Sequence, residues 1–366
     1  MPRRLFHLFP TFAVGGSQVR LAQICNHFGD RYAHTIFATD GVYDALSLIK
    51  PEVKVQTYAA SIDKRRGLRN VPLYRRVIRA LRPDVVITHN WGTIEWALAT
   101  RMTPGLRHVH IEDGFGPDEA NRQLTRRVMF RRLALGGSQT TVVVPSRVLQ
   151  DIATRNWRLP AAKVRLLPNG IDLARFAKVD ADEARHLAQK APGEVLIGTV
   201  ALLRPEKNLG LLLRAFARLP QASPTRLFVV GSGGELARLQ AHARELGLGK
   251  RVVFFGHTTA PERIMRAFDI FAMSSDTEQM PIGLLEAMAC ALPVVATDVG
   301  DIAHMVAADN RELISPARAL EPLAASLSRL VHDEVLRGRI GRKNLAKVTA
   351  EYDQRAMFAR YAELLG

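Results

Sequence analysis

Cysteine is scarce in this sequence, which contains only Cys25 and Cys290 among 366 residues. Two cysteines cannot form a disulfide framework or a cysteine-rich zinc site, and their apolar neighbours predict the reduced, packed thiols of a cytosolic protein. No stretch approaches the roughly 18 consecutive apolar residues of a transmembrane helix. The N-terminal segment MPRRLFHLFPTF has neither a sustained apolar run nor a small-residue cleavage site, so we expect no signal peptide.

Acidic residues are too few to balance the basic ones. Asp and Glu number 35 against 51 Lys and Arg, which gives a net charge of +16 and an isoelectric point near 10.5. This balance predicts an anionic partner: nucleic acid, an anionic membrane surface or a phosphorylated substrate. Aromatic residues make up only 7%, and zinc-finger spacing and aromatic ribonucleoprotein motifs are missing, which disfavours nucleic acid.

The excess charge lies in one half of the chain. Residues 1–170 hold 26 basic and 12 acidic residues, a net +14, whereas residues 171–366 hold 25 and 23, a net +2. One basic cluster lies between Lys64 and Arg82, and a second consists of Arg126, Arg127, Arg131 and Arg132. The second predicts a helix with basic and apolar residues on different faces, as in a segment lying on a membrane. A solvated basic helix without a partner is the alternative.

Short apolar runs alternate with helical patterns along the whole chain. This alternation predicts an α/β fold with parallel sheets, and ten strands fit two doubly wound domains better than one. The turn signal Pro168-Asn169-Gly170 marks the expected boundary. The expected strands are 5–9, 34–38, 84–88, 107–111, 141–145, 195–200, 226–230, 252–255, 270–273 and 293–297.

Two glycine-rich loops follow predicted strands and open predicted helices. In such a loop the amide groups and the positive end of the helix dipole suit a phosphate group. The first contains Gly15 and Gly16, and lacks the Gly-Lys-Ser/Thr of a P-loop. The second runs from Gly231 to Glu235, and a tight strand–helix turn explains its glycines equally well.

Two further loops carry charged residues. Arg204 and Lys207 follow the strand 195–200 and suit a diphosphate, although a charged surface turn is the simpler explanation for this loop alone. Glu278 and Glu286 flank Pro281, which fits the first turn of a helix. A carboxylate in the apolar surroundings of Glu286 requires a hydrogen-bond donor, which the hydroxyls of a ribose or a neighbouring arginine could supply.

The ordered set of motifs resembles family 4 of the retaining glycosyltransferases. "LRPEKN", "VVGSGGE", "VVFFGH" and "EQMPIGLLEAMACALPVVATDVG" stand in family order and spacing, and "VVVPS" and "LLPNGIDLARF" are also similar. The resemblance implies the GT-B fold, with two Rossmann-like domains facing across a cleft. Residues 1–170 would bind the acceptor and residues 171–350 the nucleotide-sugar, while a last helix, about 351–366, would pack back on the first domain.

The resemblance also implies roles for individual residues. Glu286 would bind the donor ribose and Glu278 the sugar near its 3- and 4-hydroxyls, while Lys207 and an arginine would neutralise the diphosphate. Backbone N–H groups of Gly16 and of the loop Met280, Pro281, Ile282 and Gly283 would cradle the phosphates. No metal and no other cofactor is expected, because cations and helix termini would stabilise the leaving diphosphate. The family works with retention of configuration, and no protein nucleophile is expected.

The sequence departs from the family pattern at three places. The usual arginine position is Leu202, so we expect Arg204 to replace it. Gln279 and Met280 stand where the family has a small residue and an aromatic one, so the identity of the donor sugar cannot be transferred. On the acceptor side, either His110 or Asp113 occupies the place of a family histidine.

These observations predict a retaining hexosyltransferase. It would move a sugar from a nucleoside diphosphate to a lipid-linked or polysaccharide acceptor at the cytoplasmic face of an anionic membrane, in cell-surface polysaccharide biosynthesis. The alternatives are another GT-B enzyme, such as a nucleotide-sugar epimerase, and a basic nucleic-acid-binding protein. The base, the donor sugar, the acceptor, the linkage and the oligomeric state do not follow from the sequence.

Overall fold

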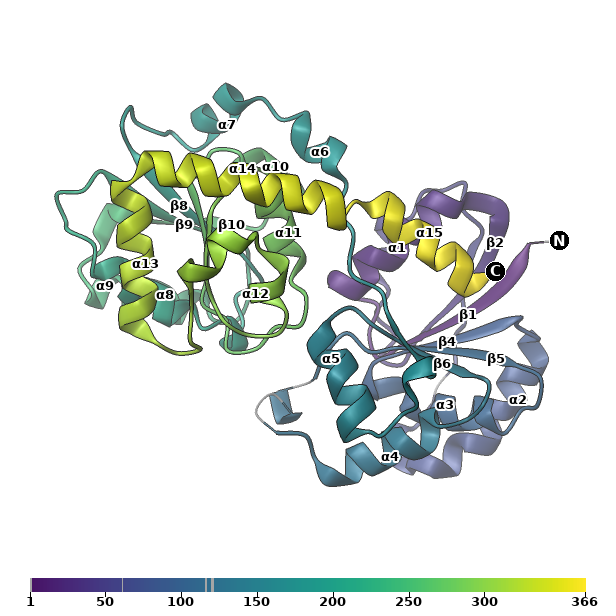
Figure 1. Ribbon diagram of the computed structural model, residues 1–366. Coiled ribbons are helices and arrows are strands. Elements are labelled where there is room, and N and C mark those ends of the chain that lie inside the picture. Colours follow the sequence, from purple (N-terminus) through teal and green to yellow (C-terminus); the bar gives the residue numbers. More distant parts are fainter. Residues whose placement is uncertain (1, 61, 116, 120–121) are drawn as a thin grey trace. The chain divides into compact units, whose positions relative to one another are not determined.

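The computed structural model describes residues 2–60, 62–115, 117–119 and 122–366, and the chain forms two compact units. The first unit runs to Pro168 and includes Met357–Gly366, whereas the second is Asn169–Ala356. Each unit contains one parallel sheet with helices on both faces (Figure 1). The chain thus leaves the first unit at the predicted Pro-Asn-Gly turn, and its last ten residues return to it.

The first unit has a seven-stranded sheet in the order β3-β2-β1-β4-β5-β6-β7. The order reverses between β1 and β4, and in a parallel sheet ligands bind at the carboxyl ends of strands beside such a reversal. The strands are β1 Arg3–Phe9, β2 Tyr32–Ala38, β3 Val55–Thr57, β4 Val85–His89, β5 Arg107–Ile111, β6 Thr140–Val144 and β7 Val164–Leu166. The helices are α1 Gly16–Phe28, α2 Val71–Leu81, α3 Ile94–Arg101, α4 Thr125–Leu135, α5 Arg147–Asp151 and, from Met357 onward, the last helix, α15 Gln354–Leu365.

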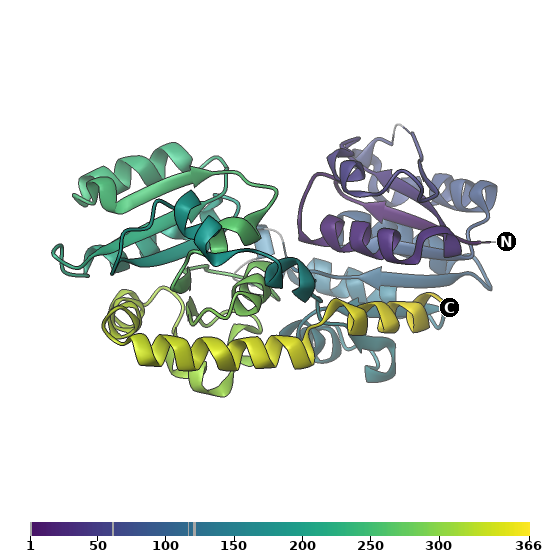
Figure 2. The same ribbon diagram turned by 90° about the horizontal axis from the view of Figure 1, so that it is seen from above.

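Alternate residues of each strand enter different cores, because successive side chains point to opposite faces of a sheet. Leu5 packs in a core that α1 and α15 complete, whereas Phe6 and Leu8 face α2 and α3. Helix α15 lies beside α1 (Figures 1 and 2). The rings of His27 and Phe358 stack between the two helices, with their centroids 3.9 Å apart. The C-terminal helix is therefore part of the core of the first unit.

The second unit has a six-stranded sheet in the order β10-β9-β8-β11-β12-β13, which reverses between β8 and β11. Three edge strands of the two sheets, β3, β7 and β13, are absent from the sequence-based assignment, because segments of two or three residues show no measurable alternation. The strands are β8 Val195–Val200, β9 Thr225–Val230, β10 Val252–Gly256, β11 Ile270–Met273, β12 Val294–Thr297 and β13 Ile314–Ser315. The helices are α6 Leu173–Ala177, α7 Ala181–Leu187, α8 Leu209–Ala217, α9 Leu236–Glu245, α10 Pro261–Met265, α11 Ile282–Ala289, α12 Ile302–Met305, α13 Leu320–His332 and α14 Glu334–Glu351.

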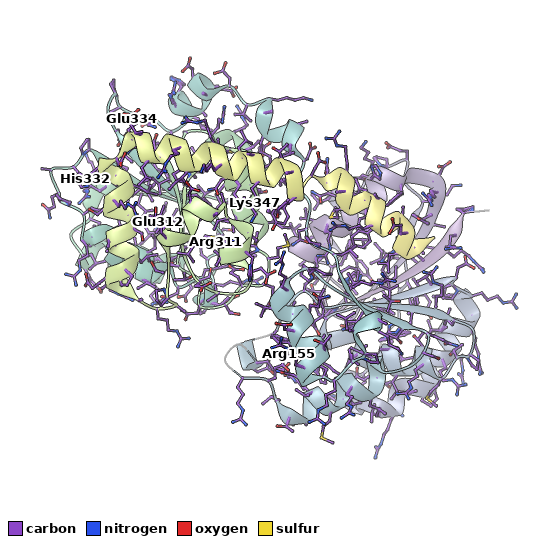
Figure 3. All side chains as sticks on the ribbon, in the orientation of Figure 1. Arg155, Arg311, Glu312, His332, Glu334 and Lys347 are labelled. Atoms are coloured by element: carbon purple, nitrogen blue, oxygen red, sulfur yellow. The ribbon has the colours of Figure 1, made fainter. Side chains whose placement is uncertain are left out.

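Helix α14 is fixed to the second unit by polar side chains and one glycine. The buried Asn344 donates to Leu292 O (2.9 Å) and to Asn310 Oδ1 (2.8 Å). Lys347, near the end of the helix, donates to backbone carbonyls of the α12 segment (Figure 3). A Cβ on Gly341 would lie 2.0 Å from Ala291 O, so only glycine permits this close approach.

Histidines are buried inside the first sheet. His7 and His34 form a hydrogen bond between ring nitrogens (3.1 Å), and the ring of His89 stacks on His7. His108, on the other face, bonds Thr88 Oγ1 at 2.9 Å. Burial lowers the pKa of His34 to about 4 and that of His108 to about 3, and it places the pKa of His7 and His89 well below the usual range. The first unit therefore folds around neutral imidazoles.

We expect the first unit to lose stability as the pH falls below about 6.5, because the unfolded chain then binds protons that His7, His34, His89 and His108 exclude in the folded state. Between pH 7.5 and 5.5 the free energy of unfolding should fall by about 1.4 kcal/mol for each of them. Urea unfolding followed by tryptophan fluorescence tests this, because all three tryptophans, at positions 91, 96 and 157, lie in the first unit. Equal free energies at the two pH values would contradict the expectation.

Candidate functional site

The loops after β8 and β11 meet at the carboxyl edge of the second sheet. Lys207 Nζ lies 2.5 Å from Glu278 Oε1, and Ser275 Oγ donates to the same carboxylate oxygen at 2.8 Å. Both side chains of the ion pair are largely enclosed, with 23% and 10% of their surfaces exposed. Two residues that are 71 positions apart, and that the sequence singled out separately, thus form one charged pair at the sheet reversal.

A second contact ties the same loops together. Asn208 Nδ2 donates to Asp276 Oδ1 at 2.8 Å, and Asp276 N donates to Glu206 O at 2.8 Å. Arg318, in the loop after β13, lies 3.2 Å from the other Asp276 oxygen. Sequence reasoning missed Asn208, Asp276 and Arg318. The polar run Ser-Ser-Asp directly after β11 was the available signal.

The glycines after β9 support the loop that carries Arg204 and Lys207. Gly231 has φ +137°, and a Cβ on it would lie 1.9 Å from Ala201 O. At Gly233, with φ +157°, a Cβ would lie 2.4 Å from Leu203 O. Leu203 N donates to Ser232 O at 2.9 Å. Close backbone packing in this strand-to-helix turn requires both glycines, and the phosphate-binding explanation stays a prediction.

Arg204 extends from this loop toward solvent. Its side chain is 61% exposed. Its Nη1 lies 4.0 Å from Glu206 Oε1, which is a weak contact. A guanidinium that is so weakly held is available to an anionic ligand. Its assignment to a diphosphate stays a prediction.

The segment 280–283 leads into α11 with a fixed backbone. Met280 is buried, and its carbonyl accepts a hydrogen bond from Asn169 Nδ2 at 3.0 Å. Pro281 is the N-cap residue of α11 and does not lie in its first turn as expected, because its ψ of 123° is extended. The amides of Ile282 and Gly283 open the helix, where the first N–H groups have no intrahelical acceptor. Such a helix start favours an anion.

A turn after β12 holds the preceding segment in place. Gly300 has φ +59°, and a Cβ there would lie 2.4 Å from Glu278 O. Asp301 N donates to Gln279 O at 2.9 Å. The backbone between Glu278 and α11 is therefore supported by a position that accepts only glycine.

Glu286 lies on α11 between buried residues on both sides. Burial, reinforced by Glu262, raises the pKa of its carboxyl to about 7, while Arg175 opposes the rise. Arg175 itself is engaged with Glu262 at 2.5 Å and with Thr259 O at 3.2 Å. In the part of the chain that the structure describes, no hydrogen bond to the Glu286 carboxylate is formed. A partly desolvated carboxylate of this kind is suited to a ligand that brings hydroxyl donors.

In the first unit, Gly16 is the first residue of α1 and Gly15 its N-cap. Gln18 Nε2 donates to Thr11 O at 2.9 Å and thereby closes the loop between β1 and the helix. A Cβ on Gly15 would lie 2.9 Å from Gln18 Oε1. Gly16 thus stands at a helix start at the carboxyl edge of the first sheet, as predicted for an anion-binding loop.

The two acceptor-side candidates differ in accessibility. His110 is fully buried, with Nδ1 2.8 Å from Thr88 Oγ1 and Nε2 3.6 Å from Glu112 Oε2. Asp113 follows the end of β5, retains 19% exposure and pairs with Arg20 at 2.7 Å. A ligand can therefore reach Asp113, whereas His110 belongs to a buried network.

The basic cluster of α4 does not form one face, so the predicted separation of basic and apolar residues is wrong. Arg131 is fully buried and makes two hydrogen bonds to Glu119, at 2.9 and 3.1 Å, and Arg127 also pairs with this carboxylate. Two buried glutamates, Glu112 and Glu119, draw this arginine inward. The face that remains exposed mixes both kinds of residue: Arg126, Met129, Arg132 and Leu133.

The loop after β4 is packed. Trp91 lies against the guanidinium groups of Arg127 and Arg131, 5.0 and 4.8 Å from its ring centroid. His89 is buried. Asn90 Oδ1 accepts the backbone N–H of Asp113 at 2.7 Å, so this loop positions the strand end that carries Asp113.

No helix in the described residues is both long enough and apolar enough to cross a bilayer.

Two family models match the chain. The model of "Glycosyltransferase Family 4" matches residues 14–175, and that of "Glycosyl transferases group 1" matches residues 180–347. D-inositol 3-phosphate glycosyltransferase of Rhodococcus erythropolis is 29% identical over 277 residues, which cover 68% of this chain and 60% of the relative. The enzyme of the same name from Stackebrandtia nassauensis is 30% identical over 283 residues, which cover 70% and 62%. The chain thus spans about 60% of the length of these curated relatives.

Solved structures share the fold over nearly the whole chain. Anabaena HepE in complex with UDP has a TM-score of 0.85 at 20% identity, with 99% of both chains covered. WaaG, a glycosyltransferase involved in lipopolysaccharide biosynthesis, has a TM-score of 0.78 at 20% identity, also with 99% of both chains covered. The architecture is that of the GT-B glycosyltransferases.

We predict that Gly231→Ala weakens binding at the second-unit site and destabilises the protein by about 2 kcal/mol or more, because the new methyl group displaces the Ala201–Lys207 loop. Gly234→Ala is the matched control, since a Cβ at this position meets nothing within 4 Å. Thermal unfolding and ligand titration of both variants test the prediction. Equal behaviour of the two variants would contradict it.

Proposed function

Because this chain belongs to glycosyltransferase family 4, we propose that it transfers a sugar from a nucleoside diphosphate to a hydroxyl group with retention of configuration. The observation that carries the proposal is the meeting of Lys207 with Glu278 at the sheet reversal, together with Glu286 on the adjoining helix α11. The chemistry of these groups fits a diphosphate and a polyhydroxyl ligand. The proposal includes a hexose as the transferred sugar.

The proposed donor is a nucleotide-sugar. HepE, which has the same fold, has been crystallised with UDP, with UDP and glucose, and with UDP-glucose. In this chain Glu286 would accept hydrogen bonds from the ribose hydroxyls, and Glu278 would accept them from the sugar. The base and the sugar are left open, because Gln279 and Met280 give the sugar pocket its own shape.

The diphosphate would be held by a cation and by backbone amides. Lys207 has three N–H donors, so it can keep its contact with Glu278 and still bind a phosphate oxygen. Arg204 supplies a second, exposed cation. The amides at the start of α11 complete the set. These groups stabilise the charge that develops on the leaving diphosphate, and we propose that no metal ion is required.

The proposed acceptor is a lipid-linked or polysaccharide hydroxyl at the cytoplasmic membrane face, as in cell-surface polysaccharide biosynthesis. Three observations support it. The first half of the chain carries a net +14, α4 exposes Met129 and Leu133 beside Arg126 and Arg132, and Asp113 stands at an accessible strand end. Arginine attracts anionic lipid headgroups, and exposed apolar side chains insert among them.

The donor assignment predicts that a nucleotide-sugar raises the melting temperature of the wild-type protein at pH 8 and does so less at pH 6. A carboxyl with a pKa of about 7 must be ionised to accept both ribose hydroxyls, and it is increasingly protonated below that pH. A ligand at 100 times its dissociation constant stabilises by about 2.7 kcal/mol. A thermal-shift panel of UDP-glucose, UDP-N-acetylglucosamine and GDP-mannose measures this.

Glu286→Ala should abolish both the rise in melting temperature with a nucleotide-sugar and the sugar transfer, while the variant still folds. Glu286→Gln should remove the difference in this rise between pH 6 and pH 8. Gln279→Ala is the matched control, because it also truncates a side chain at this site. We expect it to alter the preference among donor sugars without loss of nucleotide binding. Normal nucleotide-sugar binding by Glu286→Ala would refute the site.

The membrane assignment predicts that the fourfold change Arg126→Gln, Met129→Ser, Arg132→Gln and Leu133→Ser lowers binding to vesicles with about 30% anionic lipid by at least tenfold. Each basic residue near such a surface contributes about 1 kcal/mol, and the two apolar side chains add to it. Arg127 and Arg131 are left unchanged, because they pair with carboxylates inside the unit. Arg244→Gln with Arg342→Gln, both exposed in the second unit, is the charge-matched control. Unchanged co-sedimentation of the fourfold variant would argue against this face.

A further inference from the structure

Arg20 lies on α1, four residues after Gly16, and its side chain is only 5% exposed. Its Nη2 lies 2.7 Å from one carboxylate oxygen of Asp113 and 2.8 Å from the other. The backbone of Asp113 is fixed as well, because its N–H donates to Asn90 Oδ1 at 2.7 Å. Both the main chain and the side chain of Asp113 are therefore held.

We propose that Arg20 is a positioning residue, which holds the Asp113 carboxylate aimed at the hydroxyl group that receives the sugar. The inference rests on the proposed function. A guanidinium does not lose its proton in a protein, so its charge is constant at every pH of interest. Separation of an enclosed ion pair is costly, because it leaves each charge without its partner. The pair therefore holds the Asp113 carboxylate in place.

The other groups around the pair do not compete for the carboxylate. Tyr361, from α15, is buried, and its hydroxyl forms no hydrogen bond in the described part of the chain. His89, from β4, faces Arg20 and is neutral, since burial lowers its pKa well below the usual range. Glu112, next to Asp113 in the chain, faces Arg131 instead. Arg20 therefore sets the charge environment of Asp113.

This arrangement defines what Asp113 does in the transfer. The bond between the sugar carbon and the diphosphate oxygen breaks, and a bond forms between that carbon and the acceptor oxygen. The acceptor proton passes to the departing diphosphate, which takes the electron pair of the broken bond. Asp113, as an anion, accepts a hydrogen bond from the acceptor O–H and orients its oxygen toward the carbon. Water can take the place of the acceptor, and the reaction is then hydrolysis of the donor.

The test measures nucleoside diphosphate release from UDP-glucose, UDP-N-acetylglucosamine and GDP-mannose in water at pH 8. We expect Arg20→Met to lower kcat by about tenfold to a hundredfold with an unchanged donor KM, because a misplaced orienting group costs rate and not donor binding. Arg20→Lys keeps the positive charge but not the planar guanidinium, so we expect an intermediate kcat at the same donor KM.

A double-mutant cycle connects the two residues. Arg20→Met combined with Asp113→Asn should be no slower than the slower single variant, since both remove the same interaction. Tyr361→Phe removes one nearby buried hydroxyl without touching either charge, and we expect it to match the wild type. Urea unfolding by tryptophan fluorescence verifies that each variant folds.

The outcomes separate this inference from the proposed function. If the wild type releases diphosphate and a folded Arg20→Met variant keeps its kcat, Arg20 has no positioning role. If Arg20→Met does not fold, Arg20→Lys decides: a wild-type kcat would overturn the inference, and a reduced kcat at an unchanged donor KM would support it. If the wild type neither binds nor hydrolyses any of the nucleotide-sugars, the proposed function fails and this inference with it.

Discussion

The account of the second unit depends on the contact between Lys207 and Glu278. Two loops leave neighbouring strands β8 and β11 at the point where the strand order reverses, and this ion pair, with the Asn208–Asp276 hydrogen bond, brings them together. The rest of the local structure supports it. Gly231 and Gly233, in the loop after β9, allow close packing against the loop that carries Lys207. Gly300, in the turn after β12, packs against the backbone of Glu278. The pair also gathers opposite charges at one place, where a ligand with both phosphate and hydroxyl groups can be bound.

Each unit places a carboxylate in a controlled environment, but the control differs. Glu286 is surrounded by apolar residues, and burial raises its pKa to about 7, which leaves it in need of hydrogen-bond donors. Asp113 is instead clamped by a buried guanidinium at 2.7 Å. The first arrangement suits recognition of a neutral diol, and the second suits a fixed anion that orients a hydroxyl. The same side-chain chemistry thus serves two tasks because the neighbours differ.

The sequence was informative where patterns are long and local. The central strands, the Pro168–Gly170 turn and the loops that carry Lys207 and Glu278 all follow from alternation and glycine placement. It was less informative where a residue's role depends on a distant partner. The sequence places Arg131 among the exposed arginines of its cluster, but its ion pairs with the buried Glu112 and Glu119 hold it inside the unit. Arg20 carries no local signal, since its partner is 93 positions away. The choice between His110 and Asp113 as the acceptor-side residue depends on their burial, which the sequence does not show.

The central claim is that the ends of β8 and β11, with α11, form the nucleotide-sugar site. A crystal structure of the protein with a bound nucleotide-sugar tests it most directly. The account predicts diphosphate oxygens about 3 Å from Lys207 Nζ and from the amides that open α11, with both ribose hydroxyls on the Glu286 carboxylate. A nucleotide bound elsewhere, or a ribose that leaves Glu286 without a contact, would contradict it.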